Sequence, residues 1–483
     1  MTDRYLLDKP LKIDTRPIWL IVMDRTVRYQ VLAGILLLTV IAYNLTPPAG
    51  LSSAGYHALV LFGFTIVLWV SGLLPIAVTA LLSMVMLPLA GILPAKQTYA
   101  LFGNESVFFI LGAFILGAAM TSTGLSTRLA GAMLVRFGGS PRRLALTVFL
   151  LAAGLSFCMS EHAVAAMLFP VVLEITSSLG LKPGKSAYAK LLLMSIAWGC
   201  IIGGIATFLG GARAPLAVGI LRETTGIDVD FFDWTMAAIM IVLPLLSIGF
   251  SLLLYFFPPD LTSVEDGVRN LNRKRLEAGK ISYDEMITAL VMIATICGWM
   301  FYGRQLGLAA IAILGTAVLF TFRVVSWQKI EEYVNWGIIL MYGCSIALAS
   351  AMEKTGAALW IVNKGLGALS PTPLVVIAVI SFVAIILTEC ISHAAVVAIL
   401  MPIGLGLAQG LGIDPRIMTL AIALPAGLAY SLPMGTPATA IVYGSGHLSS
   451  REIILPGALI MTISWLLFMG SVFFVWPLIG LKL

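Results

Sequence analysis

The sequence carries the same polar interruption twice, each time inside an apolar stretch. Ser160, Glu161 and His162 stand in succession, and a related segment with Ser392 and His393 returns in the second half of the chain. The eleven positions that begin at each serine hold six identities without a gap. A chain that repeats itself, with polar breaks in apolar segments, is typical of a transporter built from two structural repeats.

The two serines are suited to begin helices. Each precedes an apolar run, which is the position of a helix N-cap. Free N–H groups at helix N-termini attract anions, and the carbonyls at helix C-termini attract cations. Two such breaks brought together could hold an anion and a coupling cation with backbone groups alone. A capped kink without a ligand is the alternative, but the duplication favours ligand binding.

Ionisable side chains stand beside both breaks. His162 and His393 are two of only four histidines in the chain, which favours contact with a ligand or a proton. A charged, unpaired Glu161 in the membrane would cost about 2.5 kcal/mol or more, so it must be protonated or paired with a cation. Arg213 either pairs with Glu161 or contacts a substrate anion. Glu389, just before the second break, either accepts backbone hydrogen bonds or takes part in transport.

The composition is that of a membrane protein. The chain has 483 residues, of which 60% are hydrophobic and 11% charged, whereas a soluble domain carries about 25% charged residues. Many apolar runs approach the ~20 residues that cross a bilayer as a helix. We therefore expect an all-α polytopic membrane protein. The net charge of +6 is assigned to membrane topology and not to nucleic-acid binding, because no basic run is interleaved with aromatic residues.

We expect about eleven transmembrane helices and two re-entrant hairpins. Arginines and lysines flank both ends of 144–181, so this segment enters and leaves the membrane on one side with its tip at the first polar break. The second hairpin is expected at 371–411. Glycine and proline density predicts that the helices at 190–222 and 415–446 are unwound in their middle. The remaining spans are expected at 29–46, 55–75, 76–94, 105–135, 234–257, 286–303, 306–323, 334–360 and 453–478.

Positive charge sets the expected orientation. Residues 1–28 form a basic segment, and the loop 259–285 holds five arginines and lysines, so both are expected in the cytoplasm. The loop separates a first half, 29–258, from a second half, 286–483. Eleven spans then place the C-terminus outside, and the two halves have opposite orientation, as in inverted repeats. The expected location is the plasma (inner) membrane.

At these motifs the chain resembles the divalent anion/sodium symporter family, the INDY-type transporters. That family has Ser-Asn-Thr at each hairpin tip and Gly-Thr-Pro-Pro-Asn in its broken helices. The corresponding tips here read Ser160-Glu161-His162 and Ser392-His393-Ala394, with Thr388-Glu389 before the second and Pro170 and Pro402 after them. The breaks read Gly210-Gly211-Ala212-Arg213-Ala214 and Gly435-Thr436-Pro437-Ala438-Thr439. Both motif asparagines and both motif threonines of the tips are replaced, and Arg213 stands in place of a proline.

The resemblance implies a homodimer in which a transport domain moves against a scaffold domain by an elevator motion. It places the substrate between the tips and the broken helices. We expect the substrate shell to consist of Ser160, His162, Arg213, Ser392, His393, Thr436 and Pro437. Carried over by position, a first sodium site would use Ser156, Ser160, Glu161 and Gly210. A second would use Thr388, Ser392, His393 and Gly435.

The expected function is secondary active transport of a small, divalent anion such as a dicarboxylate or sulfate, coupled to sodium or protons. Glu161 is the expected coupling group, as a proton carrier or as an anionic sodium ligand. No cofactor is expected besides sodium ions. Two alternatives remain: a membrane-embedded enzyme with a metal on Glu161, His162 and His393, and an anion channel.

Overall fold

The computed structural model describes residues 18–277, 279–366, 372–433 and 435–481, and these contain helices and no strand. The helices of the first half are α1 (Ile18–Tyr43), α2 (Ser53–Ser71), α3 (Ile76–Leu89), α4 (Ala95–Ala100), α5 (Glu105–Ser122), α6 (Leu125–Phe137), α7 (Pro141–Ser156), α8 (Glu161–Ser178), α9 (Ala187–Gly204), α10 (Arg213–Thr225) and α11 (Phe231–Phe256). Those of the second half are α12 (Glu265–Glu277), α13 (Tyr283–Leu306), α14 (Leu308–Thr321), α15 (Trp327–Tyr333), α16 (Trp336–Lys354), α17 (Ala357–Leu366), α18 (Pro373–Thr388), α19 (His393–Leu411), α20 (Pro415–Ala423), α21 (Pro437–Tyr443) and α22 (Ser450–Gly470).

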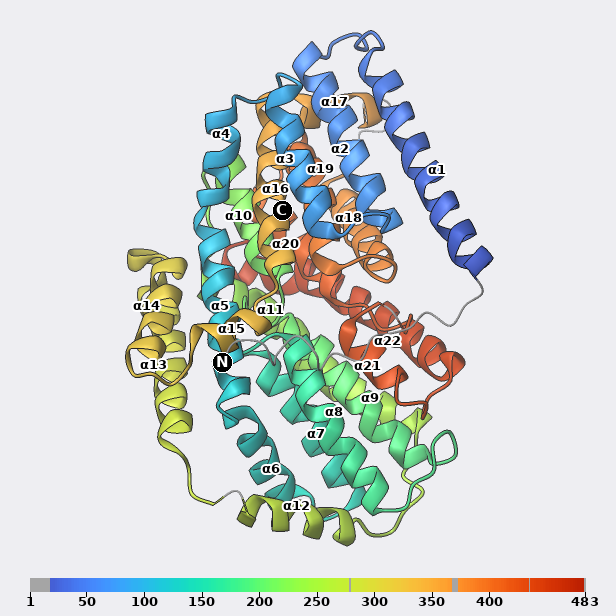
Figure 1. The fold of residues 1–483 in the computed structure, drawn as a ribbon, viewed down its shortest axis with the longest axis vertical. Helices are drawn as coiled ribbons and strands as arrows, with labels where there is room; N and C mark the ends of the chain where they lie inside the picture. Colours follow the sequence, from blue (N-terminus) through green and yellow to red (C-terminus); the bar gives the residue numbers. More distant parts are fainter. Residues whose placement is uncertain (1–17, 278, 367–371, 434, 482–483) are drawn as a thin grey trace.

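The helices have the length and apolarity of membrane spans. Eight of the described helices are long and apolar enough to cross a membrane, and four further apolar helices are shorter. The prediction of an all-α polytopic membrane protein is therefore confirmed. Helices α13 and α14 form an antiparallel pair at one side of the molecule, where α14 packs against α5 (Figure 1).

The sequence repeat is a repeat of helix pairs. Helix α18 follows α7 at the same offset in the sequence as α19 follows α8, so the two hairpins match position for position. Both tips are capped by the predicted serines: Ser160 Oγ accepts the N–H of Ala163 (3.4 Å), and Ser392 Oγ accepts that of Ala395 (3.3 Å). The first pair lies in the lower half of Figure 1 and the second in the upper half, so the hairpins enter from opposite ends.

Both predicted broken helices are interrupted. The first runs through α9 and α10 with a gap at 205–212, and the second runs through α20 and α21 with a gap that contains the short 3-10 helix Pro425–Gly427. Helix α9 lies very close to α7, because a Cβ on Gly203 would overlap the backbone of Ala153. Glycine at this position thus allows the first broken helix to pack against the first hairpin.

Three sequence expectations need correction. The spans expected at 105–135 and 334–360 are each two helices, because Gly124 (φ 83°) and Gly356 (φ 73°) adopt the left-handed conformation that ends a helix. The helix that holds the span expected at 29–46 begins earlier, at Ile18, inside the expected N-terminal segment, whereas its apolar part is Tyr29–Tyr43 as expected. The linker 259–285 contains the helix α12. The expectations for residues 1–17 and for the C-terminal Leu483 lie outside the described residues.

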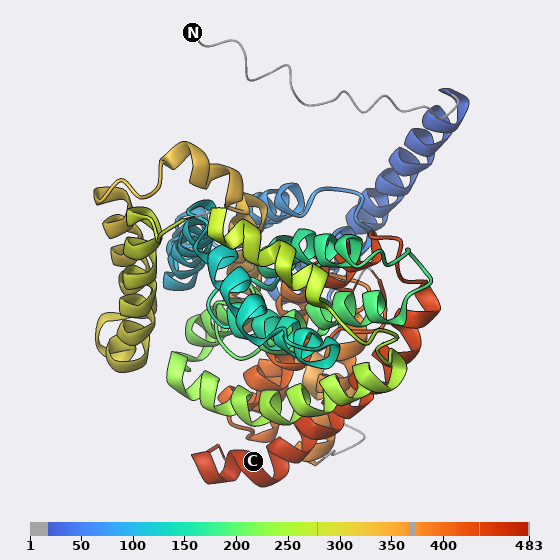
Figure 2. The ribbon, with the colours of Figure 1, turned by 90° about the horizontal axis from the view of Figure 1, so that it is seen from below.

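Helix α12 lies across the lower ends of the teal helices, not alongside them (Figures 1 and 2). It packs against α6 and α8. Val268 reaches the turn between α6 and α7, where a Cβ on Gly138 would lie 3.2 Å from its side chain. On the other side, Asn270 donates a hydrogen bond to Ser178 Oγ (3.0 Å) at the end of α8. The polar linker therefore covers this end of the helix bundle.

Candidate functional site

The two hairpin tips and the first broken helix meet at three charged or polar side chains. Glu161 and His393 are the first residues of α8 and α19, and Arg213 is the first residue of α10. Glu161 Oε1 lies 3.2 Å from His393 Nδ1, and Glu161 Oε2 lies 3.6 Å from Arg213 Nη1. The N–H of Glu161 also donates to the carbonyl of Gly210 (3.0 Å). We call Glu161, Arg213 and His393 the buried charge cluster.

The cluster is closed off from solvent. Glu161 and Arg213 are each 1% exposed and His393 is 9% exposed. Burying a carboxylate or a guanidinium alone is very costly, so each charge depends on the other. With a neutral His393 the cluster has no net charge.

His393 faces a donor and an acceptor with the same nitrogen. Its Nδ1 lies 3.3 Å from Arg213 Nη1 and 3.2 Å from Glu161 Oε1. An Nδ1 that carries a hydrogen can donate to Glu161, whereas a bare Nδ1 can accept from Arg213. The position of one proton therefore decides which partner the imidazole binds.

Several polar atoms of the cluster are incompletely satisfied. Among the described residues, Nε and Nη2 of Arg213 and Nε2 of His393 have no hydrogen-bond partner, and the carboxylate oxygens of Glu161 have only their contacts with His393 and Arg213. Buried polar groups are almost always satisfied by protein or by ordered water. An ion, a water molecule or a proton bound at this place would therefore change the free energy of the buried charge cluster strongly.

Arg213 also connects the two broken helices. A Cβ on Gly211 or on Gly427 would overlap its guanidinium group, so the side chain passes from the first break to the backbone of the second. The buried hydroxyls of Tyr342 and Tyr430 lie within electrostatic range of Arg213. Sequence reasoning missed both tyrosines, because an aromatic residue in an apolar helix has the pattern of ordinary core.

Glu389 holds the second break together. Its carboxylate accepts the backbone N–H groups of Tyr430 (2.8 Å), Ser431 (2.8 Å) and Leu432 (2.7 Å). These donors belong to the unwound segment and have no helical acceptor. Glu389 therefore accepts backbone hydrogen bonds, as one of the two alternatives expected, but from the second break and not from the tip.

The residues expected at the first sodium site lie around the first tip. Ser156 is fully buried beside Cys200, whereas Ser160 Oγ caps α8. The carbonyl of Gly210 already accepts the N–H of Glu161. The carboxylate of Glu161 faces Arg213, whose positive charge opposes a second cation at this place.

The second expected sodium site has a mixed donor set. Thr388 Oγ1 donates to the carbonyl of Ala426 (2.8 Å), and His393 offers ring nitrogens where the related family has an amide oxygen. In the first half a bond between break and tip runs the other way, because Thr207 Oγ1 of the break donates to the carbonyl of Phe157 at the tip (2.7 Å). Sequence reasoning missed Thr207, which no repeated motif marks.

The remaining predicted residues lie near the cluster without joining it. Thr436 is buried and caps α21 by accepting the N–H of Thr439 (3.1 Å), and Pro437 follows it as the first residue of that helix. Gly435 lies against Glu389, because a Cβ there would come within 2.7 Å of Oε2. The side chains of His162 and Ser392 are exposed.

A small cavity of about 70 Å³ adjoins the first tip. Ser160 and Gly211 line one side, and Gly117 and Thr121 of α5 line the other. The first tip and the first break therefore face α5 across a space that small molecules could occupy.

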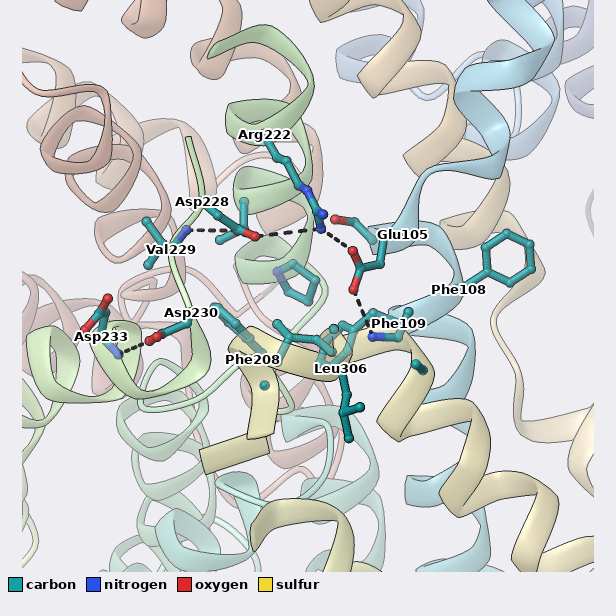
Figure 3. Close-up of a pocket in the computed structure, with 18 of the residues that line it drawn as sticks. Glu105, Phe108, Phe109, Phe208, Arg222, Asp228, Val229, Asp230, Asp233 and Leu306 are labelled. Carbon is teal, nitrogen blue, oxygen red and sulfur yellow. Dashed lines mark hydrogen bonds and ion pairs between the residues drawn. The ribbon is translucent and has the colours of Figure 1, made fainter. Parts of the chain in front are cut away.

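A larger cavity of about 930 Å³ lies between α5, α10, α11 and the α13–α14 turn (Figure 3). Arg222 at the end of α10 pairs with Glu105 in the first turn of α5, and it lies 3.7 Å from Asp228. Partial burial raises the pKa of Asp228, and the charge of Arg222 opposes that rise. The Glu105–Arg222 pair thus ties the first broken helix to α5.

The donor geometry does not support a metal centre at the tips. Within the described part of the chain, no three His, Cys, Asp or Glu side chains lie close enough to share a metal ion.

Comparisons with known proteins agree with this architecture. The family model described as "Sodium:sulfate symporter transmembrane region" matches residues 26–481. A sodium-dependent dicarboxylate transporter, SdcS, of Staphylococcus saprophyticus is 27% identical over 467 residues, which cover 91% of this chain and 90% of that protein. SdcS of Staphylococcus aureus strain USA300 is 27% identical over 92% of this chain and 89% of the relative.

Two solved structures share the fold. The YdaH transporter of Alcanivorax borkumensis matches with a TM-score of 0.51 and 18% identity, over 80% of this chain and 91% of its own. MtrF of Neisseria gonorrhoeae, described as one of a class of antimetabolite efflux pumps, matches with a TM-score of 0.52 and 15% identity, over 81% of this chain and 85% of its own.

Proposed function

Because the chain belongs to the sodium:sulfate symporter transmembrane family, we propose that it is a secondary active transporter of a small divalent anion, a dicarboxylate or sulfate. The observation that carries this proposal is the meeting of two capped hairpin tips at the buried charge cluster. Helix N-termini at both tips attract an anion, and the SdcS relatives are named as dicarboxylate transporters. The anion would bind at Ser160, Ser392 and Thr436, beside the small cavity at the first tip.

The proposed movement is an elevator motion. The hairpins and broken helices, α7–α11 and α18–α22, would form the transport domain, and α1–α5 with α13–α16 the scaffold. The Glu105–Arg222 pair and the cavity around it lie on this proposed boundary. Two chains would associate through their scaffolds into a homodimer in the plasma membrane. The linker with α12 would lie in the cytoplasm and the C-terminus outside.

The proposed coupling ion is a proton. The positive charge of Arg213 lies 3.6 Å from the carboxylate of Glu161 and already neutralises it. A sodium ion at this place would therefore find no unpaired negative charge to bind. His393 Nδ1 faces both of them, and a histidine can change its charge between about pH 5 and 8. The other titratable or charged groups around Glu161 are His162, Cys200 and Tyr430. Sodium coupling, as in the names of the relatives, is the competing proposal.

A substrate panel on purified protein in liposomes tests these proposals. Succinate, citrate, sulfate and a monocarboxylate control would be offered under sodium and pH gradients that are varied independently. Accumulation of a divalent anion against its gradient is the expected result. Downhill flux alone, at a rate independent of either gradient, would identify a channel and contradict the proposal.

A further inference from the structure

A groove between α6 and α7 has no part in the proposed transport site. It has a volume of about 760 Å³. Leu129 and Met133 of α6 and Leu146 and Leu150 of α7 form its walls, each with 37–47% of the side chain exposed. Such a row of exposed leucine and methionine side chains requires an apolar neighbour.

The two arginines of the groove lie at one end of it. Arg136 and Arg143 flank the turn at 138–140, where α6 passes into α7. Both side chains are exposed, and no carboxylate of the described residues pairs with either. The other end of the groove, at Gly154 and Leu155, is free of charge.

The arginine end lies at the boundary with water. The turn contacts Val268 of α12, which belongs to the polar linker. From Arg143 to Leu155 the helix rises about 18 Å at 1.5 Å per residue. This is close to half of the ~30 Å hydrocarbon core, so the groove spans roughly one leaflet.

We propose that this groove binds an anionic phospholipid, with the phosphate group at Arg136 and Arg143 and an acyl chain along the leucine walls. Two unpaired positive charges select an anionic headgroup over a zwitterionic one. A peptide would leave its backbone groups unsatisfied there, because the one hydroxyl on the walls, that of Thr147, already donates to the carbonyl of Arg143 (2.8 Å). The proposal does not depend on which anion is transported.

Native mass spectrometry of the full chain tests the headgroup preference. The purified protein would be titrated with phosphatidylglycerol or with phosphatidylcholine of the same acyl chains. Phosphatidylglycerol should bind more tightly, and R136Q or R143Q should each weaken it about five-fold, since one basic residue near anionic lipid is worth about 1 kcal/mol. The matched control is R142Q, which removes an exposed arginine from the same turn but outside the groove.

A groove-filling variant tests the acyl-chain site. A Cβ on Gly154 meets no atom within 4 Å, so G154F places its ring in open space and should leave thermal unfolding unchanged. It should reduce binding of both lipids. Equal affinity for the two lipids, or an equal loss in R142Q, would overturn the proposal. A shift of the monomer–dimer equilibrium in G154F with unchanged lipid binding would show that a second copy of the chain fills the groove.

Discussion

Glu161 and His393 are the first residues of equivalent helices in the two repeats, and their side chains lie 3.2 Å from each other. The start of α8 in the first repeat therefore contacts the start of α19, its equivalent in the second repeat, where the two hairpin tips meet. A carboxylate in one copy and an imidazole in the other make this contact asymmetric in charge. Arg213 completes it from the first broken helix.

The first prediction concerns the pairing of Glu161 with Arg213. R213A leaves a buried carboxylate alone and should lower the free energy of unfolding by about 3–5 kcal/mol, seen as a lower Tm in detergent. E161Q/R213A should recover most of this loss, because neither charge then remains. If the double variant regains stability but not substrate binding, Arg213 contacts the anion directly. R213K should rescue only in part, because lysine lacks the planar fork.

The second prediction concerns coupling. Uptake should depend strongly on pH between about 5.5 and 8, the range in which histidine changes charge, and only weakly on sodium. E161N/H393N places asparagine at both tips and should make uptake more dependent on sodium. Transport that is strictly sodium-dependent and flat over that pH range would show that neither group carries the coupling proton.

The third prediction concerns the Glu105–Arg222 pair between the two proposed domains. Because both side chains are partly exposed (30% and 48%), the pair should add less than about 1 kcal/mol to stability. It should instead favour one position of the transport domain, so E105Q should change the transport rate with little change in Tm. R222Q should change the rate in the same direction, because it removes the same pair from the other side.

The control for this prediction is D266N. It breaks the Arg269–Asp266 pair, which is exposed and lies within the single helix α12. An equal change of rate in D266N would mean that surface charge, and not the link between α5 and α10, is responsible.

The fourth prediction concerns Glu389. E389A leaves three backbone N–H groups of the second break without an acceptor, at a cost of about 1–3 kcal/mol each where they are buried. We expect a large drop in Tm, a smaller drop for E389Q, which keeps one acceptor oxygen, and no drop for the exposed control E353A. Normal stability of E389A with lost transport would instead assign Glu389 to transport.

The fifth prediction concerns topology. Cysteines at Ser263 and Leu483 should be labelled from opposite sides of the membrane, with Ser263 in the cytoplasm. The background would carry serine at Cys297 and Cys390, which are exposed. Labelling of both positions from one side would contradict the inverted orientation of the two halves.

The sequence by itself determined the membrane class, the repeat and the capping serines at both tips. Long apolar runs and few charged residues determine the membrane class, and identity at a fixed offset reveals the repeat. The caps are also local, because Ser160 and Ser392 accept the N–H groups of Ala163 and Ala395 in the turn that follows each serine. These properties depend on composition or on residues that are neighbours in the sequence, so the sequence alone is enough to predict them.

Only the tertiary structure decided which groups meet. The sequence left Arg213 free to pair with Glu161 or to face a substrate, because the whole of α8 and α9 lies between the two side chains along the chain. The close packing of α7 on α9 brings the first break to the first tip, and the meeting of the hairpins adds His393. The same holds for Glu389. The three N–H groups that it accepts belong to an unwound segment far along the chain, which reaches Glu389 only because α18 and α20 pack together.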